Sequence, residues 1–281
     1  MGEVDDRIVR ALRMIEADMA EEVVFDDIAR SVLLSPSRFH HLFAEEVGCP
    51  PGVYLRRIRL DAAALRLRWT QDTVGRIAIG LGYTSQASFS HAFVRRFGVT
   101  PARFRHAFDK TLPALAPSET LGAIRVRDIV SFHVIAKRYV GDLSTVRRFW
   151  EDFERSLPGS PKTWSNEIFM GLLYDDPRMT AANEVRYDCC VTAGSGHLNS
   201  GALLRKRGLH IISTRPGSYC CTQFSGHRDH LAGAYQHLCD GWLKSSRYVV
   251  SDDPAIELHA RPRHRMPPHE LQLTLMIPLE A

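Results

Sequence analysis

Hydrophobic residues recur at helical spacing through the first 108 residues. Residues 5–20 carry apolar side chains at i, i+4, i+7 and i+11, which is one face of an amphipathic helix: Ile8, Leu12, Ile15 and Met19. The same pattern predicts further helices over 25–32, 36–47, 51–68, 73–81, 86–97 and 101–108. Ser35 before Pro36 predicts a capped helix start, and Gly48 predicts the end of that helix. This part of the chain is therefore predicted to be all α-helical.

A short helix, a turn and a second helix occur twice in this region, about fifty residues apart. In each copy the second helix has two phenylalanines at i and i+4 on one face, with a histidine pointing away between them. The residues are Phe39, His41 and Phe43 in the first copy and Phe89, His91 and Phe93 in the second. Two such units in tandem are typical of a DNA-binding protein.

The second half of the chain alternates between strand-like and helical patterns. Strands are predicted over 130–136, 168–174, 187–192, 209–214, 219–224 and 271–277, and helices over 143–153 and 230–243. This order indicates an α+β domain. A strand–Gly–helix segment also repeats with an offset of 85 residues: Tyr139-Val140-Gly141, Val146, Trp150 and Phe153 return as Phe224-Ser225-Gly226, Leu231, Tyr235 and Leu238. The repeat predicts a pseudo-twofold domain with a concave site where its two units meet.

A change of composition separates the two patterns. Residues 109–122 contain Pro, Ala, Ser and Gly with little periodicity, which predicts a linker between a domain over 1–108 and a domain over 123–281. The chain of 281 residues, with a hydrophobic fraction of 44%, is long enough for two ordinary cores. We therefore expect a multidomain protein.

Charge is distributed unevenly between neighbouring parts of the helical region. Residues 51–110 contain eleven Lys and Arg against three Asp and Glu, a net charge of +8, whereas residues 1–50 have a net charge of −6. A basic stretch that coincides with helix-turn-helix motifs fits a surface that faces DNA phosphates.

Several other classes of protein are disfavoured. The longest apolar runs are far shorter than a membrane span, and the acidic start is unlike a secretory signal, so we expect a cytoplasmic protein with no membrane partner. The adjacent pairs Cys189-Cys190 and Cys220-Cys221 lie in strand-like runs and are expected to be buried, reduced thiols. There is no glycine-rich phosphate loop, zinc-ligand spacing or nucleophile elbow, and we expect no cofactor and no metal.

The first 108 residues resemble the DNA-binding domain of the AraC/XylS family. The second copy carries the most specific stretch: Ile77-Ala78, Leu81-Gly82-Tyr83, Ser85, Phe89, Ser90, Phe93, Phe97-Gly98, Thr100-Pro101 and Arg105. The resemblance implies seven helices in which a long helix joins two helix-turn-helix units. It also implies that the two reading helices enter successive major grooves on one face of the DNA, ~34 Å apart.

This resemblance implies which residues contact DNA. The family's base-reading positions fall on Ser37, His40 and His41 in the first unit and on Gln86, Ala87, Ser88 and His91 in the second. Many members have arginine where His41 and His91 stand, and histidine donates to guanine without the bidentate fork of arginine. Arg95 and Arg96 suit phosphate contacts, which position the protein without specifying sequence. The expected partners are double-stranded promoter DNA and RNA polymerase.

Residues 123–281 resemble a GyrI-like effector domain, a module also found in multidrug-sensing regulators. The matching features follow one another along the half: Phe169-Met170-Gly171, Tyr174-Asp175-Asp176-Pro177, Arg186-Tyr187-Asp188, Gly217-Ser218-Tyr219, Trp242-Leu243, Ile256-Glu257 and Ile277-Pro278-Leu279. The resemblance implies an α+β domain of two repeated units with a groove between them, which binds a small-molecule effector.

In that family a glutamate near the penultimate strand often faces the ligand, and Glu257 occupies its position. Apolar neighbours predict that this carboxylate is partly buried, which is costly unless a partner such as a cationic ligand balances it. Aromatic side chains favour such a ligand through cation–π contacts, and the candidates are Trp164, Tyr174, Tyr187 and Trp242. The alternative is that these are mostly core aromatics and that Glu257 pairs with an arginine. His259 stands where the family often has a tyrosine.

The leading hypothesis is a sequence-specific DNA-binding transcriptional regulator, not an enzyme, controlled by a small-molecule effector such as a lipophilic cation. A second hypothesis makes the GyrI-like half a hydrolase of reactive small molecules, with Glu257 and Tyr187 as acid/base groups. A third makes the chain a sequence-tolerant DNA-binding protein whose C-terminal half only docks partners.

Overall fold

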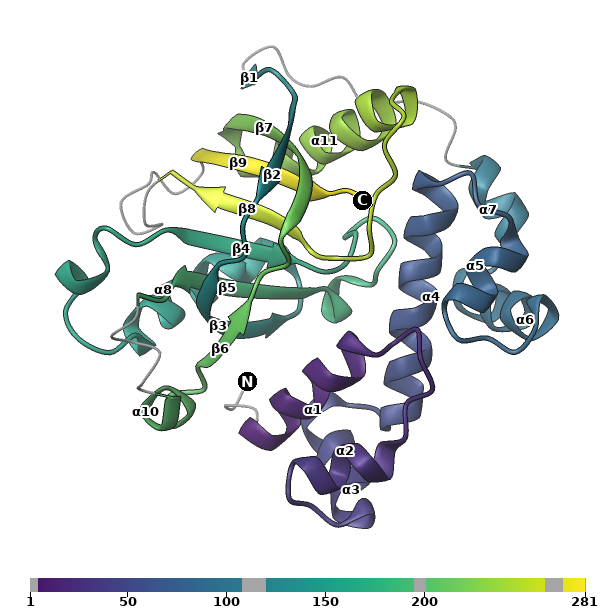
Figure 1. The fold of residues 1–281 in the computed structure, drawn as a ribbon, viewed down its shortest axis with the longest axis horizontal. Coiled ribbons are helices and arrows are strands. Elements are labelled where there is room, and N and C mark those ends of the chain that lie inside the picture. Colours follow the sequence, from purple (N-terminus) through teal and green to yellow (C-terminus); the bar gives the residue numbers. More distant parts are fainter. Residues whose placement is uncertain (1–4, 108–119, 195–200, 261–269, 281) are drawn as a thin grey trace. The chain divides into compact units, whose positions relative to one another are not determined.

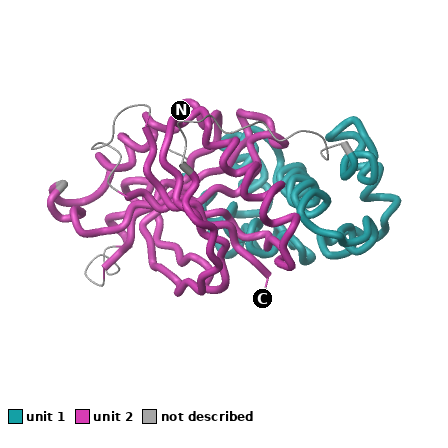
Figure 2. The backbone as a smooth tube through the Cα atoms, turned by 90° about the horizontal axis from the view of Figure 1, so that it is seen from above, with its two compact units in different colours: residues 1–110 teal, residues 111–281 magenta. Residues whose placement is uncertain are grey.

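The computed structural model describes residues 5–107, 120–194, 201–260 and 270–280. The chain divides into two compact units, residues 1–110 and residues 111–281, coloured separately in Figure 2. None of the helices in the described ranges is both long enough and apolar enough to cross a membrane. Most of the predicted linker, residues 109–119, lies outside the described residues.

Unit 1 is all α-helical over its described residues, as the sequence predicts (Figure 1). Its helices are α1 (Asp6–Ala17), α2 (Phe25–Ser31), α3 (Pro36–Val47), α4 (Pro51–Trp69), α5 (Val74–Gly80), α6 (Gln86–Phe97) and α7 (Pro101–Ala107). The pairs α2–α3 and α5–α6 are the two helix-turn-helix units, and the long α4 connects them.

Capping side chains fix where the two reading helices begin. The Ser35 hydroxyl accepts a hydrogen bond from the Arg38 amide at 3.3 Å, and the Ser85 hydroxyl accepts one from the Ser88 amide at 3.1 Å. Gly48 and Gly98 end the helices in the left-handed conformation, with φ of 82° and 75°. These contacts satisfy backbone groups that a helix end leaves unpaired, so the predicted boundaries of α3 and α6 are confirmed.

Paired phenylalanines anchor each reading helix to its own core. Phe39 and Phe43 of α3 are fully buried, with ring centroids 5.6 Å apart, and pack with Ile8, Ile15 and other residues of α1, α2 and α4. Phe89 and Phe93 of α6 are equally buried, and Phe93 also contacts Phe104 of α7 edge to face at 5.2 Å. Such burial holds one face of each helix and leaves the other exposed.

Unit 2 is built on one antiparallel sheet, shown in Figure 1. Its described strands are β1 (Thr120–Leu121), β2 (Arg125–Ile129), β3 (His133–Val140), β4 (Phe169–Leu173), β5 (Arg186–Thr192), β6 (His210–Ser213), β7 (Gly217–His227), β8 (Ala255–His259) and β9 (Glu270–Pro278). Their order is β1-β7-β9-β8-β4-β5-β3-β6, and β2 also pairs with β7. The α+β class is confirmed.

Helices lie between these strands along the chain. The α-helices are α8 (Val146–Ser156), α10 (Gly201–Arg205) and α11 (Leu231–Gln236), and α11 continues as the π-helical segment η5 (His237–Leu243). Short 3₁₀ turns cover Leu143–Thr145, Pro161–Trp164, Ala182–Glu184 and Arg228–His230. Trp150 and Phe153 of α8 are fully buried and belong to the same cluster as Tyr187 and Cys189 of β5, so α8 covers one face of the sheet.

The sheet order has the symmetry that the sequence repeat predicts. One half consists of β3, α8, β4 and β5 and the other of β7, α11, β8 and β9, and the two meet where β4 pairs with β8. Within each half the first strand pairs with the last, as Ala136 with Cys190 and Cys221 with Met276 show. This correspondence places Gly171 opposite Glu257, at the junction of the two halves.

Two details differ from the sequence-based expectation. The strand predicted over 130–136 occupies His133–Val140, because its register is set by pairing with both β5 and β6. Thr120 and Leu121 lie just before the end of the predicted linker at residue 122. They form β1 and pair with Ser225 and Phe224 of β7. Both depend on distant strands that the local pattern does not reveal.

Candidate functional sites

All seven predicted base-reading residues are exposed on the two reading helices. They are Ser37, His40 and His41 of α3 and Gln86, Ala87, Ser88 and His91 of α6. Two of them also serve the local fold. The His40 ring packs edge-on against Phe25 and Phe39, and the Ser88 hydroxyl donates to the Ser85 carbonyl at 2.9 Å. His41 and His91 occupy equivalent exposed positions, one on each helix.

The two arginines at the end of α6 have different surroundings. Arg95 is exposed, whereas Arg96 donates from Nε and Nη2 to the two oxygens of Asp61 in α4, at 2.7 Å and 3.0 Å. The Asp61 side chain is only 5% exposed, so this bidentate ion pair ties α6 to α4. The geometry therefore assigns Arg96 a structural contact and leaves Arg95 available for phosphate.

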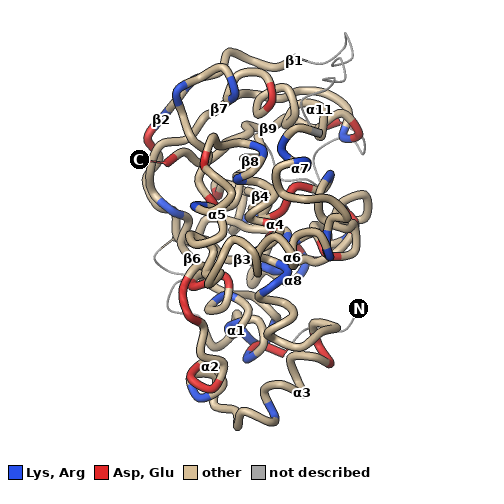
Figure 3. The backbone as a smooth tube through the Cα atoms, turned by 90° about the vertical axis from the view of Figure 1, so that its right-hand side faces the viewer, with Lys and Arg blue, Asp and Glu red and all other residues tan. Residues whose placement is uncertain are grey.

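Basic residues continue along the neighbouring helices of unit 1. The last turns of α4, α6 and α7 are basic, whereas the first turn of α2 is acidic, with Asp26 and Asp27. Figure 3 marks Lys and Arg in blue and Asp and Glu in red along the backbone. Arg105 of α7 donates to the carbonyls of Leu67 and Asp72, at 3.1 Å and 2.5 Å, so part of this basic stretch also holds the helices together.

In unit 2 the site around Glu257 lies in the interior, on the sheet face that α8 covers. Glu257 is 3% exposed, and its oxygens accept hydrogen bonds from the hydroxyls of Tyr187 at 2.8 Å and Tyr235 at 3.1 Å. Within the described ranges no cation pairs with this carboxylate. The alternative interpretation, in which Glu257 pairs with an arginine, is therefore wrong, and its partners are two phenols, one from β5 and one from α11.

Gly171 makes this arrangement possible. It pairs with Glu257 across β4 and β8, and a Cβ atom at this position would lie 1.7 Å from the Tyr187 hydroxyl. Only a glycine therefore lets the phenol of Tyr187 cross β4 and reach the carboxylate.

The environment of Glu257 favours neutral phenols. Burial, together with the nearby carboxylate, raises the pKa of Tyr235 well above its ordinary value. The Tyr235 hydroxyl therefore stays protonated and donates a hydrogen bond to Glu257. The π-helical segment η5 begins two residues after Tyr235, and such segments are frequent at functional sites.

Of the four aromatic candidates, the structure brings only Tyr187 to Glu257. Trp164 is buried in the core, and its indole N–H donates to the Pro158 carbonyl at 2.9 Å. The Trp242 ring stacks on Tyr248 with centroids 5.8 Å apart. These two side chains have core or local packing roles in this structure.

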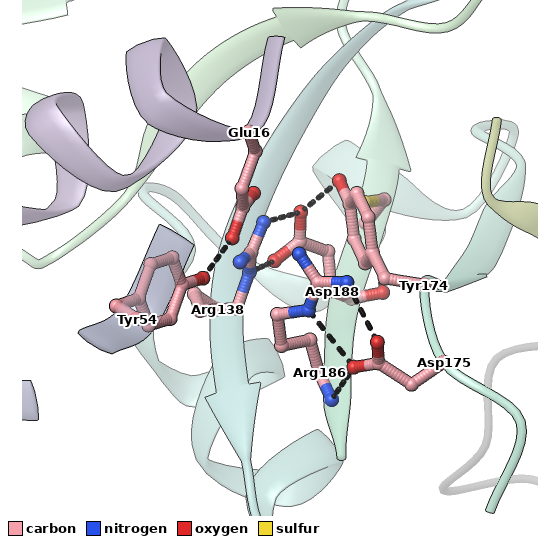
Figure 4. Close-up of polar contacts among 8 residues, drawn as sticks. Glu16, Tyr54, Arg138, Tyr174, Asp175, Arg186 and Asp188 are labelled. Carbon is pink, nitrogen blue, oxygen red and sulfur yellow. Dashed lines mark hydrogen bonds and ion pairs between the residues drawn. The ribbon is translucent and has the colours of Figure 1, made fainter. Parts of the chain in front are cut away.

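Tyr174 lies on the opposite face of the sheet from Glu257. Its hydroxyl donates to Asp188 at 2.8 Å, and its ring lies 4.4 Å from the Arg138 guanidinium, which also donates to Asp188 at 2.6 Å (Figure 4). Arg186 beside it donates to Asp175 at 2.9 Å and 2.6 Å. Side chains of a strand alternate between faces, so Asp188 points away from its neighbour Tyr187.

Sequence reasoning did not assign two aromatic residues near this site. Tyr235 donates to Glu257, and the Trp150 ring lies edge-on to Tyr187 at 6.3 Å and to His259 at 5.1 Å. The 85-residue repeat did identify Trp150 and Tyr235 as equivalent helix positions. What it did not reveal is that both helices direct these rings toward the same face of the sheet.

The adjacent cysteine pairs are buried thiols, as expected. Burial raises the pKa of Cys220 to about 12 and also raises that of Cys221. Because the thiolate is the reactive form, the raised pKa makes Cys220 and Cys221 poor nucleophiles, which fits a packing role.

Comparison with known proteins relates both units to characterised families. Residues 28–107 match the family described as a helix-turn-helix domain, and residues 123–280, more than half of the chain, match the GyrI-like small molecule binding domain. The HTH-type transcriptional regulator Rv1931c of Mycobacterium tuberculosis is 39% identical over 82 residues, which are 29% of this chain and 32% of that protein. The putative HTH-type transcriptional regulator YkgA of Escherichia coli K12 is 34% identical over 107 residues, 38% of this chain and 45% of that protein. The chain thus spans less than half the length of these curated relatives.

Among solved structures, an AraC-type transcriptional regulator from Chromobacterium violaceum is 29% identical, with a TM-score of 0.35, and the match covers 36% of this chain and 89% of that one. The chain belongs to the GyrI-like small-molecule-binding family and also carries a helix-turn-helix domain.

Proposed function

We propose that this protein is a cytoplasmic, sequence-specific transcriptional regulator whose DNA binding is controlled by a small-molecule effector, with RNA polymerase as a further partner. The observation that carries the proposal is the pair of capped helices, α3 and α6, that present seven exposed polar or small residues at the predicted reading positions. They are joined in one chain to a domain of a small-molecule-binding family.

The histidines are the residues on which base recognition depends most. His41 and His91 are exposed at equivalent positions, and each would donate to guanine acceptors in its own major groove. Arg95 would contact phosphate next to the second groove. Such contacts orient the protein, while the histidines and their neighbours read the sequence.

Selection of bound duplexes from random DNA by the full chain tests this proposal. His41→Ala and His91→Ala should each relax preference in a different half of the selected site, with losses of about 1–3 kcal/mol per base contact. His106→Ala provides a matched control, since His106 is an exposed histidine of α7 outside the reading helices. Equal weakening on every sequence would mean that His41 and His91 contact only phosphate.

We further propose that the effector is a lipophilic cation that binds at Glu257. A carboxylate that is 3% exposed and held only by phenols offers its negative charge to a ligand. The rings of Tyr187, Tyr235 and Trp150 would supply apolar area and cation–π contacts. Binding requires the ligand to displace at least one tyrosine hydroxyl from Glu257, and this movement would distinguish the bound state from the free one.

Calorimetric titration of the full chain with tetraphenylphosphonium and neutral triphenylphosphine oxide separates charge from shape. Glu257→Gln should lower the affinity for the cation by at least about tenfold and leave the affinity for the neutral ligand nearly unchanged, because the substitution removes only the charge. Glu151→Gln, on the exposed side of α8, is the matched control. Equal losses for both ligands would make Glu257 a structural residue.

The contact between Tyr187 and Glu257 also keeps the hydrolase hypothesis open, because a phenol 2.8 Å from a carboxylate has the geometry of an acid/base pair. Incubation with a reactive ester discriminates the two functions. Turnover that Tyr187→Phe abolishes would favour the hydrolase, and stoichiometric binding without turnover would favour the regulator.

A further inference from the structure

Arg59 stands near the middle of α4, the 19-residue helix that both helix-turn-helix units share. Its side chain donates to three backbone carbonyls. Nε donates to Met19 at 2.6 Å, Nη2 to Glu21 at 2.6 Å and Nη1 to Gly82 at 3.3 Å. Met19 and Glu21 precede the first helix-turn-helix unit, and Gly82 lies in the turn of the second. One guanidinium therefore connects the loop that leads into the first helix-turn-helix unit with the turn of the second.

The chemistry of these acceptors explains why an arginine stands there. Met19 and Glu21 follow the C-terminal end of α1, and Gly82 follows the C-terminal end of α5. Carbonyls of such irregular segments have no partner in a helix or a sheet, so a partly buried one needs another donor. A planar cation with five N–H donors can serve carbonyls of both segments at once, which the single ammonium of lysine does with less directional precision.

The backbone packs closely around this guanidinium. Gly82 has φ of 73°, and a Cβ atom added to it would lie 2.7 Å from Nη2 of Arg59 and 3.0 Å from the carbonyl oxygen of Ala20. The loop after α1, the middle of α4 and the turn of the second unit thus meet at one point. Burial at this point lowers the pKa of Arg59, and the carbonyls compensate the partly desolvated charge.

We propose that Arg59 is a positioning residue that fixes the distance and angle between α3 and α6, and thereby the spacing of the two DNA half-sites that the protein accepts. The proposal rests on the proposed DNA-binding function. Arg59 adds to α4 a second connection between the two helix-turn-helix segments, and without it bending or twisting of α4 changes the separation of α3 and α6. One inserted base pair moves a half-site by about 3.4 Å and turns it by about 34°, so a rigid connection rejects it.

The first test compares spacings on DNA with the full chain. A duplex that the wild type selects from random DNA is remade with one base pair inserted or removed between its half-sites. We expect the wild type to lose affinity by at least about thirtyfold and Arg59→Met by less than about fivefold, since a looser junction adapts to both spacings. Arg56→Met, three residues away on the exposed side of α4, should keep the wild-type penalty. An unchanged penalty in Arg59→Met would overturn the proposal.

The second test needs no DNA, so it separates failure of this proposal from failure of the proposed function. Spin labels are placed at Glu45 of α3 and Val94 of α6, both exposed, in a Cys49→Ser background. Pulsed electron–electron resonance should give a narrow distance distribution for the wild type and a broader one for Arg59→Met. Equally narrow distributions would overturn the proposal, even in a protein that binds no duplex.

Arg59→Lys serves both tests if Arg59→Met does not fold. It keeps the charge but cannot donate to three carbonyls in one fixed plane. We therefore expect its loss of affinity on re-spaced DNA, and the width of its distance distribution, to lie between those of the wild type and Arg59→Met. A lysine variant with both wild-type values would show that charge alone suffices and would contradict the positioning role of the guanidinium.

Discussion

The two helix-turn-helix units have the same skeleton and different attachments. Both combine a helix of seven residues with a helix of twelve, and both begin the second helix at a capping serine and end it at a left-handed glycine. Their buried phenylalanines also correspond. In the second helix-turn-helix unit, the pair Arg96–Asp61 ties α6 to α4, and the core continues into α7 through Phe104.

This difference shows which features a duplicated reading unit must keep. Caps and core positions define the helix and its buried face, so both copies retain them. The ends of the reading helices differ in charge, with Glu45 and Glu46 in α3 and Arg95 and Arg96 in α6. If the chain binds DNA as proposed, we expect the second helix-turn-helix unit, with Arg95 exposed, to contact phosphate more than the first, and the first to contribute mainly through base contacts.

The turns differ as well. Leu33 in the first unit has φ of 60° and is 87% exposed, whereas Gly82 at the corresponding place in the second has φ of 73° and packs against Arg59. The first turn tolerates a strained leucine because nothing crowds its side chain. Glycine is needed in the second because the backbone of another segment approaches it.

The largest expected effect concerns the two arginines at the end of α6. Arg96→Ala removes the bidentate hydrogen bonds that Arg96 donates to the buried Asp61 carboxylate and should lower the free energy of unfolding by about 3 kcal/mol. Arg95→Ala should change the free energy of unfolding by less than about 0.5 kcal/mol. It should nevertheless reduce the slope of log affinity against log salt concentration by about 1, the effect of losing one phosphate contact. Urea unfolding and binding at several salt concentrations measure the two effects. Equal stabilities of the two variants would erase the distinction between the arginines.

The turns provide a reciprocal pair of substitutions. Gly82→Ala should destabilise the protein by at least about 1–2 kcal/mol, the usual cost of a left-handed non-glycine residue, with crowding against Ala20 in addition. Leu33→Gly should stabilise it by about 0.5 kcal/mol, because relief of strain exceeds the entropy cost of glycine. Thermal unfolding of both variants checks the pair, and a loss of stability in Leu33→Gly would show that the leucine side chain has a packing role.

The smallest expected effect is a pH dependence of the free energy of unfolding that arises in the second helix-turn-helix unit. Burial raises the pKa of Tyr83, while Leu34 stands at the corresponding place in the first unit. The folded protein therefore holds this proton more tightly than the unfolded chain. That contribution to stability is fully present below pH ~10 and is lost as pH rises through the folded-state pKa. Tyr83→Phe should make the decline of unfolding free energy between pH 8 and 11 less steep, and an identical decline would exclude a role for Tyr83.

Local patterns in the sequence were sufficient to predict most of unit 1. Periodicity located α3 and α6, and the serine and glycine caps fixed their ends, because these signals act within one turn of helix. In unit 2 the repeat predicted the two-part sheet, and the resemblance identified Glu257. The sequence could not say that Tyr187, and not Tyr174, would reach this carboxylate, because that depends on which face each strand residue occupies.

The sequence by itself thus determined the helical unit, the exposed positions that we propose to read bases, the α+β class and the burial of the Glu257 carboxylate. Only the tertiary structure decided that Arg96 pairs with Asp61, that Tyr235 joins Tyr187 at Glu257, and that Arg59 serves three carbonyls. The physical reason is that helix formation and capping depend on near neighbours in the chain. Strand register and backbone acceptors bring together residues as distant in the chain as Thr120 and Ser225, and a carbonyl acceptor has no signature in residue identity.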